Sequence, residues 1–502
     1  MQKLFVSKSV DLRARAADAY IYLLLFVFPL FTGFHGYAKI TASKFVFFEL
    51  STLALLLVVL PASCRRADRF SFKTAPLTEK LLSVYLAVCV LSAVLSPYRA
   101  KTFLGAGRYD GLYTTLLCLT AFFCVRRFAR PKAGYVYAAA LGGGVNCLVA
   151  LLQLFGRNPL GLFPSGYTFF DAGVHFSSVF LGTIGNADLF SAYLCLILPL
   201  TTVYYITSGR RNGWLLPLVA LFALCLFACG VSGGVLAFAV CLVCAAPFVV
   251  TDGARLARAL DAAAVLCIGA FFAFPLHVTT PKGGGAVTVP GSFPAKAFVL
   301  PALAAVLLVC RFMTAKKEFR SRNLKLAFSA LSLACVAGGF AALYFYPGGS
   351  GTIYELSQAL HGHLEDGYGS SRVLIWKKLL ALVPERPLLG GGPGTLAARL
   401  DLTFSRVVPE TGKTLKAFVD NAHNEYLGIL VNTGALSLAA YLAAVVATLR
   451  RARKGKAGDL AAPLACALLC YWVQAFFGLG LFLVAPMMWV LWGLASVKQP
   501  KA

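Results

Sequence analysis

Long apolar runs recur along the whole chain, and this feature limits the possible folds more than any other. A helix needs about 20 apolar residues to cross a hydrocarbon core about 30 Å thick. One isolated segment can satisfy its backbone groups in lipid only as a helix. We therefore predict fourteen transmembrane helices, at roughly 17–34, 44–62, 77–96, 111–127, 134–155, 186–207, 214–230, 234–250, 259–277, 294–312, 326–347, 424–448, 461–478 and 480–497.

The composition excludes a soluble domain. Hydrophobic residues make up 59% of the 502 positions and charged residues only 13%, whereas soluble domains have about 25% charged residues. The two short runs that meet at Ser232-Gly233-Gly234 also permit one broken element, so the expected fold is an all-α integral membrane protein with about 12–14 transmembrane helices. Residues 1–347 hold the first eleven helices, 348–422 form one long extracytoplasmic loop with amphipathic helices, and 423–502 hold the last three.

Basic residues fall in every second loop of this arrangement. They cluster at 65–73, 126–132, 210–211, 255–258, 316–322 and 450–456. Short loops rich in Lys and Arg remain in the cytoplasm, so both termini are predicted to be cytoplasmic. The formal charge of +26 is then explained by topology signals and contact with anionic membrane lipids rather than by binding of nucleic acid.

The cysteines do not indicate a disulfide framework. Nearly all of the 15 lie inside predicted helices, and none lies in the loops placed outside. Neither disulfides nor a metal site is therefore expected on the outer face.

The long loop is where the sequence gathers chemistry, because long loops without their own regular structure are usually functional. Ser370-Ser371 is expected to cap a helix that ends at Pro384 and Pro387. The turn 388–394 follows, and its glycines permit two interpretations. Either the backbone N–H groups approach a ligand closely, or the turn is a plain connector.

The loop ends at Asp420-Asn421-Ala422-His423-Asn424-Glu425, where the chain re-enters the bilayer. A single histidine is more often structural than catalytic. Imidazole is nevertheless the side chain best suited to proton transfer near neutral pH, and His423 is predicted to face the outer side.

Three segments resemble the signatures of the O-antigen ligase and polysaccharide polymerase superfamily, in the same order along the chain. The first is Gly182-Thr183-Ile184-Gly185-Asn186-Ala187-Asp188, which is similar to the family's Gly-Asn motif. The second runs from Ser371-Arg372-Val373 to the glycine turn, and the third is His423-Asn424-Glu425-Tyr426-Leu427 with the helix that follows.

The resemblance implies a metal-independent membrane glycosyltransferase without a cofactor, in the bacterial cytoplasmic membrane. It implies transfer of a glycan from a polyprenyl diphosphate carrier to the hydroxyl of an acceptor glycan or lipid on the outer face. His423 corresponds to the residue that acts on the acceptor and Arg372 to an arginine that binds the diphosphate. Further substrate-binding residues are then expected at Arg108, Arg386, Asn186, Asn424 and Glu425. Whether the enzyme is a ligase or a polymerase stays open.

The sequence departs from the family pattern at one place. Many members carry Ser-Arg-Gly near the start of a mid-chain helix, where this chain has Ser232-Gly233-Gly234. Arg108, in another outer loop, is a candidate substitute for the missing arginine.

Two other classes of function remain. A transporter or flippase of lipid-linked sugars has a similar number of helices, but such proteins tend to show repeated halves and polar groups near mid-bilayer. A non-catalytic membrane scaffold is the third class. Turnover of a lipid-linked glycan by purified protein discriminates the enzyme from both.

Overall fold

The computed structural model describes residues 2–64, 75–164, 180–276, 293–314, 319–407, 414–453 and 458–497. Each of the fourteen predicted segments contains helix within this part of the chain. The membrane helices are α1 (Gln2–Tyr22), continued by the π-helical η1 (Leu23–Val27) and α2 (Phe28–Leu30), α3 (Ile40–Cys64), α4 (Leu77–Val94), α6 (Leu112–Phe128), α7 (Ala133–Leu154), α9 (Ala187–Ser208), α10 (Leu216–Ala228), α11 (Ser232–Val249), α12 (Gly253–Ala273), α13 (Val299–Thr314), α14 (Ser321–Tyr344), α18 (Glu425–Arg453), α19 (Ala461–Gln474) and α20 (Ala485–Ala495).

Length and composition agree with a membrane protein. Among the described residues, ten helices are long and apolar enough to span a membrane, and α19 and α20 are shorter apolar helices. The all-α membrane fold is thus confirmed. The two short runs near residue 232 form two separate helices, because Gly230 takes a left-handed φ of 72° between α10 and α11.

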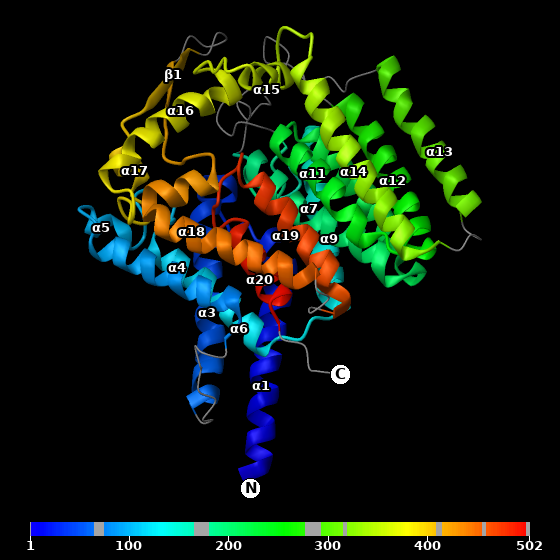
Figure 1. Ribbon diagram of the computed structural model, residues 1–502. Helices are drawn as coiled ribbons and strands as arrows, with labels where there is room; N and C mark the ends of the chain where they lie inside the picture. The colour runs from blue at the N-terminus through cyan, green and yellow to red at the C-terminus, as the bar shows by residue number, and fades with distance from the viewer. Residues whose placement is uncertain are drawn as a thin grey trace.

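The segment between α14 and α18 covers one end of the helix bundle, which we call the loop face (Figure 1). In Figure 1 this end lies at the top, and α1 starts at the bottom. The elements of the segment are α15 (Thr352–Leu360), α16 (Tyr368–Leu382), the 3-10 helix η6 (Val383–Glu385), α17 (Leu396–Arg399), β1 (Thr403–Val407) and β2 (Thr414–Phe418). The two strands pair antiparallel, with Thr403 opposite Phe418 and Val407 opposite Thr414.

The core is centred on α9. Its apolar window is entirely buried inside the protein, whereas that of α14 is not buried at all. Helices α7, α10, α11, α12 and α19 pack around α9. The Gly-Asn motif leads into the start of α9, so a fully buried helix positions that motif.

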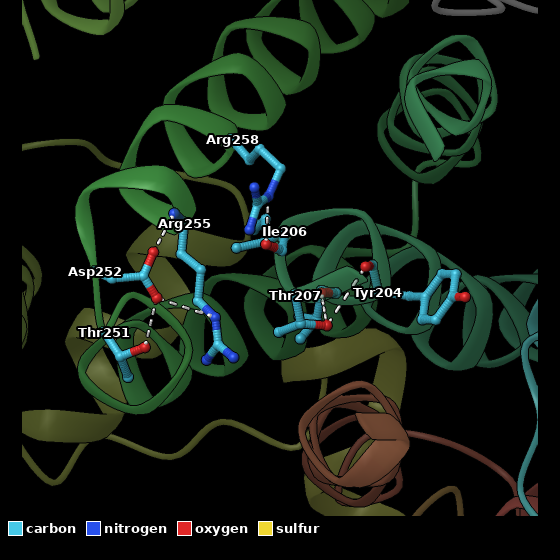
Figure 2. A network of polar contacts seen from close by, with 8 residues as sticks. Tyr204, Ile206, Thr207, Thr251, Asp252, Arg255 and Arg258 are labelled. Carbon is cyan, nitrogen blue, oxygen red and sulfur yellow. Dashed lines mark hydrogen bonds and ion pairs between the residues drawn. The ribbon is translucent and has the colours of Figure 1, made fainter. Parts of the chain in front are cut away.

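The basic segments that the structure describes gather at the end opposite the loop face. Lys132 Nζ lies 2.6 Å from Asp18 Oδ2, and Arg453 lies over the Phe248 ring. In Figure 2, Arg258 Nε donates to the Ile206 carbonyl at 2.7 Å. This grouping agrees with the predicted alternation of loops, while the basic residues at 65–73, 316–317 and 454–456 lie outside the described residues. Which end faces the cytoplasm stays a prediction.

Candidate functional site

Helix α16 carries Arg372 at the point where regular helical geometry begins. The three preceding residues, Gly369, Ser370 and Ser371, have left-handed φ values of 63°, 57° and 65°. The start of the helix has no side-chain cap hydrogen bond, so the predicted cap at Ser370-Ser371 is wrong. The predicted end is confirmed, because α16 stops at Leu382 and Pro384 lies in η6. Left-handed serines are uncommon, since the Cβ atom crowds the backbone, and they fix the position from which Arg372 projects.

The glycine turn 388–394 docks onto a break in helix α18. The break is at Gly434, whose φ is 84°, and it leaves two carbonyl groups without helical partners. Gly391 N and Gly392 N donate to the carbonyls of Val431 and Asn432 at 3.1 and 2.7 Å. The amides of Ala435 and Leu436 donate in return to the carbonyls of Pro387 and Leu388.

The turn is therefore neither a plain connector nor an open cradle for a ligand. Its amides at Gly391 and Gly392 are already occupied by helix carbonyls. Arg399 reinforces the junction by donating from Nη2 to the Val431 carbonyl at 3.0 Å and to Asn432 Oδ1 at 3.1 Å. Burial lowers the pKa of Arg399. The loop segment is thus fastened to the helix that begins just after His423.

Three contacts fix the backbone around His423. The indole Nε1 of Trp376 on α16 donates to the Ala422 carbonyl at 3.0 Å. The His423 amide donates to Asn421 Oδ1 at 3.2 Å, and His423 itself has a left-handed φ of 48°. Asn424 Oδ1 caps α18 by accepting from the Leu427 amide at 3.0 Å. Asn424 thus has a structural task at the helix start.

Two ion pairs surround the His423 ring. Arg108 Nε lies 2.6 Å from Asp420 Oδ2, and Arg372 Nη2 lies 3.5 Å from Asp188 Oδ2. Arg372 Nη1 also donates to the Gly369 carbonyl at 2.9 Å. Residues from four separate regions of the chain therefore meet here, and we call His423, Arg372, Arg108, Asp188 and Asp420 the His423 cluster.

The cluster favours the neutral form of the imidazole. Burial lowers the pKa of His423, and the positive charges of Arg372 and Arg108 lower it further, although Asp188 and Asp420 act in the opposite direction. Nδ1 is buried and has no hydrogen-bond partner among the described residues. A neutral ring with one free nitrogen can accept a proton from a bound hydroxyl.

The other predicted residues lie in different surroundings. Asn186 caps α9, because its side chain accepts from the Leu189 amide at 3.0 Å, while Asp188, two residues on, is the motif residue that reaches the cluster. Glu425 accepts from Tyr441 at 2.7 Å and from Tyr471 at 3.3 Å. Arg386 is exposed and donates to the Leu95 carbonyl at 2.7 Å, beside a separate hollow that Arg99 and Lys101 also line.

Sequence reasoning assigned no role to Asp188 and Asp420. Asp188 ends the Gly-Asn motif, two residues after Asn186, and Asp420 stands three residues before the His-Asn motif that begins at His423. A carboxylate in or next to two of the motifs was the available signal, since partly buried guanidinium groups need partners.

The structure also explains why no arginine stands at position 233. A Cβ atom on Gly233 would lie 2.8 Å from the Cβ of Phe477, and one on Gly234 would overlap the Ser191 hydroxyl. These glycines allow α11 to pack closely against α9 and the end of α19, so this chain has no room for the family arginine there. Within the described residues, no group of three His, Cys, Asp or Glu side chains is arranged to hold a metal ion.

Comparison with known families agrees with this geometry. Residues 295–442 match the O-antigen ligase family. The predicted resemblance is confirmed. The matched stretch, which we call the ligase segment, runs from just before α13 into α18 and includes Arg372, the glycine turn and His423. No curated protein matches the chain. The ligase segment supports a membrane role of the glycan ligase or polymerase type.

Proposed function

We propose that this protein is a glycosyltransferase that moves a glycan from a polyprenyl diphosphate carrier to an acceptor hydroxyl. The observation that carries the proposal is the His423 cluster, in which an imidazole with a lowered pKa and an unpartnered Nδ1 lies near two arginines. Three of its members, Arg372, Asp420 and His423, stand in the ligase segment. The metal-independent mechanism predicted from the sequence belongs to the same proposal.

The arginines are suited to the leaving group. When the bond between the anomeric carbon and the diphosphate oxygen breaks, its electron pair stays on the diphosphate and adds negative charge there. Guanidinium groups can meet that charge with two parallel N–H bonds and do not lose their own protons near neutral pH. In this proposal Arg372 and Arg108 exchange part of their contact with Asp188 and Asp420 for contact with the phosphates.

His423 is suited to the acceptor. As the acceptor oxygen forms its bond to the anomeric carbon, its proton moves to the free nitrogen of the imidazole. The imidazolium then passes this proton to water or to the released diphosphate. Burial and the two arginines keep the ring neutral beforehand, so it is ready to accept the proton at pH 7.

The orientation of the protein forms part of the same proposal. The loop face is placed on the outer side of the bacterial cytoplasmic membrane, and the basic end is placed in the cytoplasm. A carrier whose tail stays in the bilayer then presents its diphosphate at the level of the His423 cluster. The loop segment 348–422 is proposed to act as the substrate-binding unit and the flanking helices as its scaffold.

Purified protein in sealed proteoliposomes tests the proposal. It is incubated with a polyprenyl diphosphate-linked glycan and a labelled acceptor, and both the labelled product and the released carrier diphosphate are measured. Equal amounts of the two are expected. Movement of the lipid-linked glycan across a sealed bilayer without product would instead indicate a flippase. The absence of both product and movement would favour a non-catalytic scaffold.

A further inference from the structure

A cavity of about 150 Å³ lies between α4, α6, α18 and α20, beside the His423 cluster. Asp110, Asp420 and Asn421 line it at the loop face, and Glu425 and Trp489 line it further along α18 and α20. His423 is not part of its wall, but the residues on both sides of His423 in the chain are. A ligand in this cavity therefore lies next to the candidate proton acceptor.

The size of the cavity corresponds to one six-membered ring. An enclosed cavity of about 150 Å³ in another protein takes one benzene molecule. The walls here are of a different kind, because they combine aromatic rings with hydrogen-bonding groups. Such a combination suits an amphipathic ring with apolar C–H faces and polar edges.

The aromatic side of the cavity includes Tyr441, Phe482 and Trp489. Tyr441 and Trp489 lie with ring centroids 6.3 Å apart at an interplanar angle of 66°. The hydroxyl of Tyr441 is directed to Glu425 Oε1 at 2.7 Å. The ring and the carboxylate therefore form one continuous surface with an apolar part and an acceptor part.

Carboxyl groups line the polar side of the cavity, and one of them, Asp420, is paired with Arg108 at 2.6 Å. Asp110, Asp420 and Glu425 all line it, and none of the lining residues is Lys, Arg or His. Burial raises the pKa of Asp110 to about 6, so this carboxyl is still mostly ionised at pH 7.5. Ionised carboxylates accept hydrogen bonds from hydroxyl groups, and they repel another anion in a site of low dielectric constant.

We propose that this cavity binds an uncharged pyranose ring of the glycan and excludes acidic sugars. The inference rests on the proposed function for the identity of the ligand as a glycan. It adds a division of the site, in which the arginines of the His423 cluster receive the phosphates and the carboxylate-lined cavity receives a neutral sugar. Both the first sugar of the donor and the terminal sugar of the acceptor have the required chemistry.

Direct binding tests the inference without turnover. The purified full chain is mixed with methyl glucopyranoside or with the methyl glycoside of glucuronic acid, and saturation-transfer NMR measures the two affinities. The neutral sugar is expected to bind at least about tenfold more tightly, the discrimination that a few charge contacts supply. Equal affinities, tighter binding of the acidic sugar, or no binding of the neutral sugar at its solubility limit would overturn the inference.

Variants locate the binding in the cavity. Glu425→Gln and Asp110→Asn remove charge with little change in shape, so each is expected to reduce the discrimination to about threefold or less. Asp366→Asn is the matched control, because Asp366 is an exposed carboxylate that pairs with Lys377 at 2.7 Å outside the cavity. Unchanged discrimination in both cavity variants, checked for folding by thermal unfolding, would contradict the assignment.

Competition separates the two sources of the sugar. Inhibition of transfer by the methyl glycoside that is competitive with the acceptor assigns the cavity to the acceptor, and competition with the donor assigns it to the donor. Inhibition that is competitive with neither substrate would overturn the inference. Sugar binding without any glycan transfer would refute the proposed function and leave the cavity assignment intact, whereas transfer without sugar binding would refute only the cavity.

Discussion

At the scale of single residues, the charges around His423 set its protonation state. Two arginines and two carboxylates act on the ring, and burial together with Arg372 prevails, so the pKa lies below its usual value. The same arginine is the candidate ligand of the diphosphate. One residue can therefore prepare the proton acceptor and receive the leaving group.

The pH dependence of kcat/KM should reflect this arrangement. A base must be unprotonated, so the rate should fall as the pH decreases through the pKa of His423, with a midpoint below the usual imidazole value of about 6.5. Arg372→Gln removes a positive charge that lowers this pKa, so the midpoint should move to higher pH in any remaining activity. Burial also raises the pKa of Asp110 to about 6, so Asp110→Asn is the control, and it should retain the acidic limb if His423 is the base. A rate that rises as the pH decreases would contradict the assignment of His423 as a base.

Replacement of Arg372 distinguishes recognition of phosphate from simple attraction of charge. Arg372→Lys keeps the charge but loses the two parallel N–H donors, so kcat at saturating donor should fall by about 100-fold or more, nearly as far as in Arg372→Ala. Lys377→Ala, on the same helix, should retain activity because Lys377 pairs with exposed Asp366. If Arg372→Lys stays within twofold of the wild type, Arg372 only anchors the segment to headgroups.

At the scale of elements, the junction between the glycine turn and α18 holds the candidate site together. Gly434 needs both its left-handed φ and its missing side chain, because a Cβ there would overlap the Leu388 carbonyl. The four backbone hydrogen bonds across the junction depend on that close approach. Any shift of the turn would also move Arg399 and, with it, the start of the β1–β2 hairpin.

Gly434→Ala should therefore destabilise the loop segment. Backbone strain alone contributes about 1–3 kcal/mol, and the overlap with Leu388 adds to it. The midpoint of thermal unfolding in detergent should decrease, and proteolysis in the segment should become faster. Gly338→Ala is the control, since Gly338 has ordinary φ and open space around its Cα. Equal stability of the two variants would show that the junction is not a structural requirement.

Local patterns predicted the helices well and the junction poorly. Apolar length alone identifies a transmembrane helix, because backbone groups in lipid must be satisfied within the segment. The role of the glycine turn could not be predicted in this way, because its amides donate to carbonyls at a break in α18, further along the chain. The pairing of Asp188 with Arg372 is equally non-local, because the two residues stand in motifs far apart in the chain.

At the scale of the whole molecule, the bundle separates a basic end from the loop face. Helix α14 runs from Ser321 to Tyr344 and connects the two ends directly. With a rise of about 1.5 Å per residue, a helix of this length spans a bilayer. The positions just before and just after α14 should therefore lie on opposite sides of the membrane.

Cysteine labelling tests this topology. In a background without exposed native cysteines, Glu365→Cys at the loop face should react with a membrane-impermeant maleimide in intact cells. Ser321→Cys should react only after the membrane is permeabilised, because basic loops remain in the cytoplasm. Both positions are exposed, so burial does not explain a difference. The reverse pattern would invert the orientation and place the candidate site in the cytoplasm.

The most direct test of the whole account is the transfer rate of His423→Ala with a polyprenyl diphosphate-linked glycan and a labelled acceptor. Loss of a positioned general base should lower turnover by about 10²- to 10⁴-fold, without loss of the folded protein and without an effect of chelators on the wild type. His363→Ala is the matched control, because His363 is exposed and lies in the same loop segment. Its ring Nδ1 makes a hydrogen bond with the side chain of Gln358. Turnover of His423→Ala within twofold of the wild type would contradict the account.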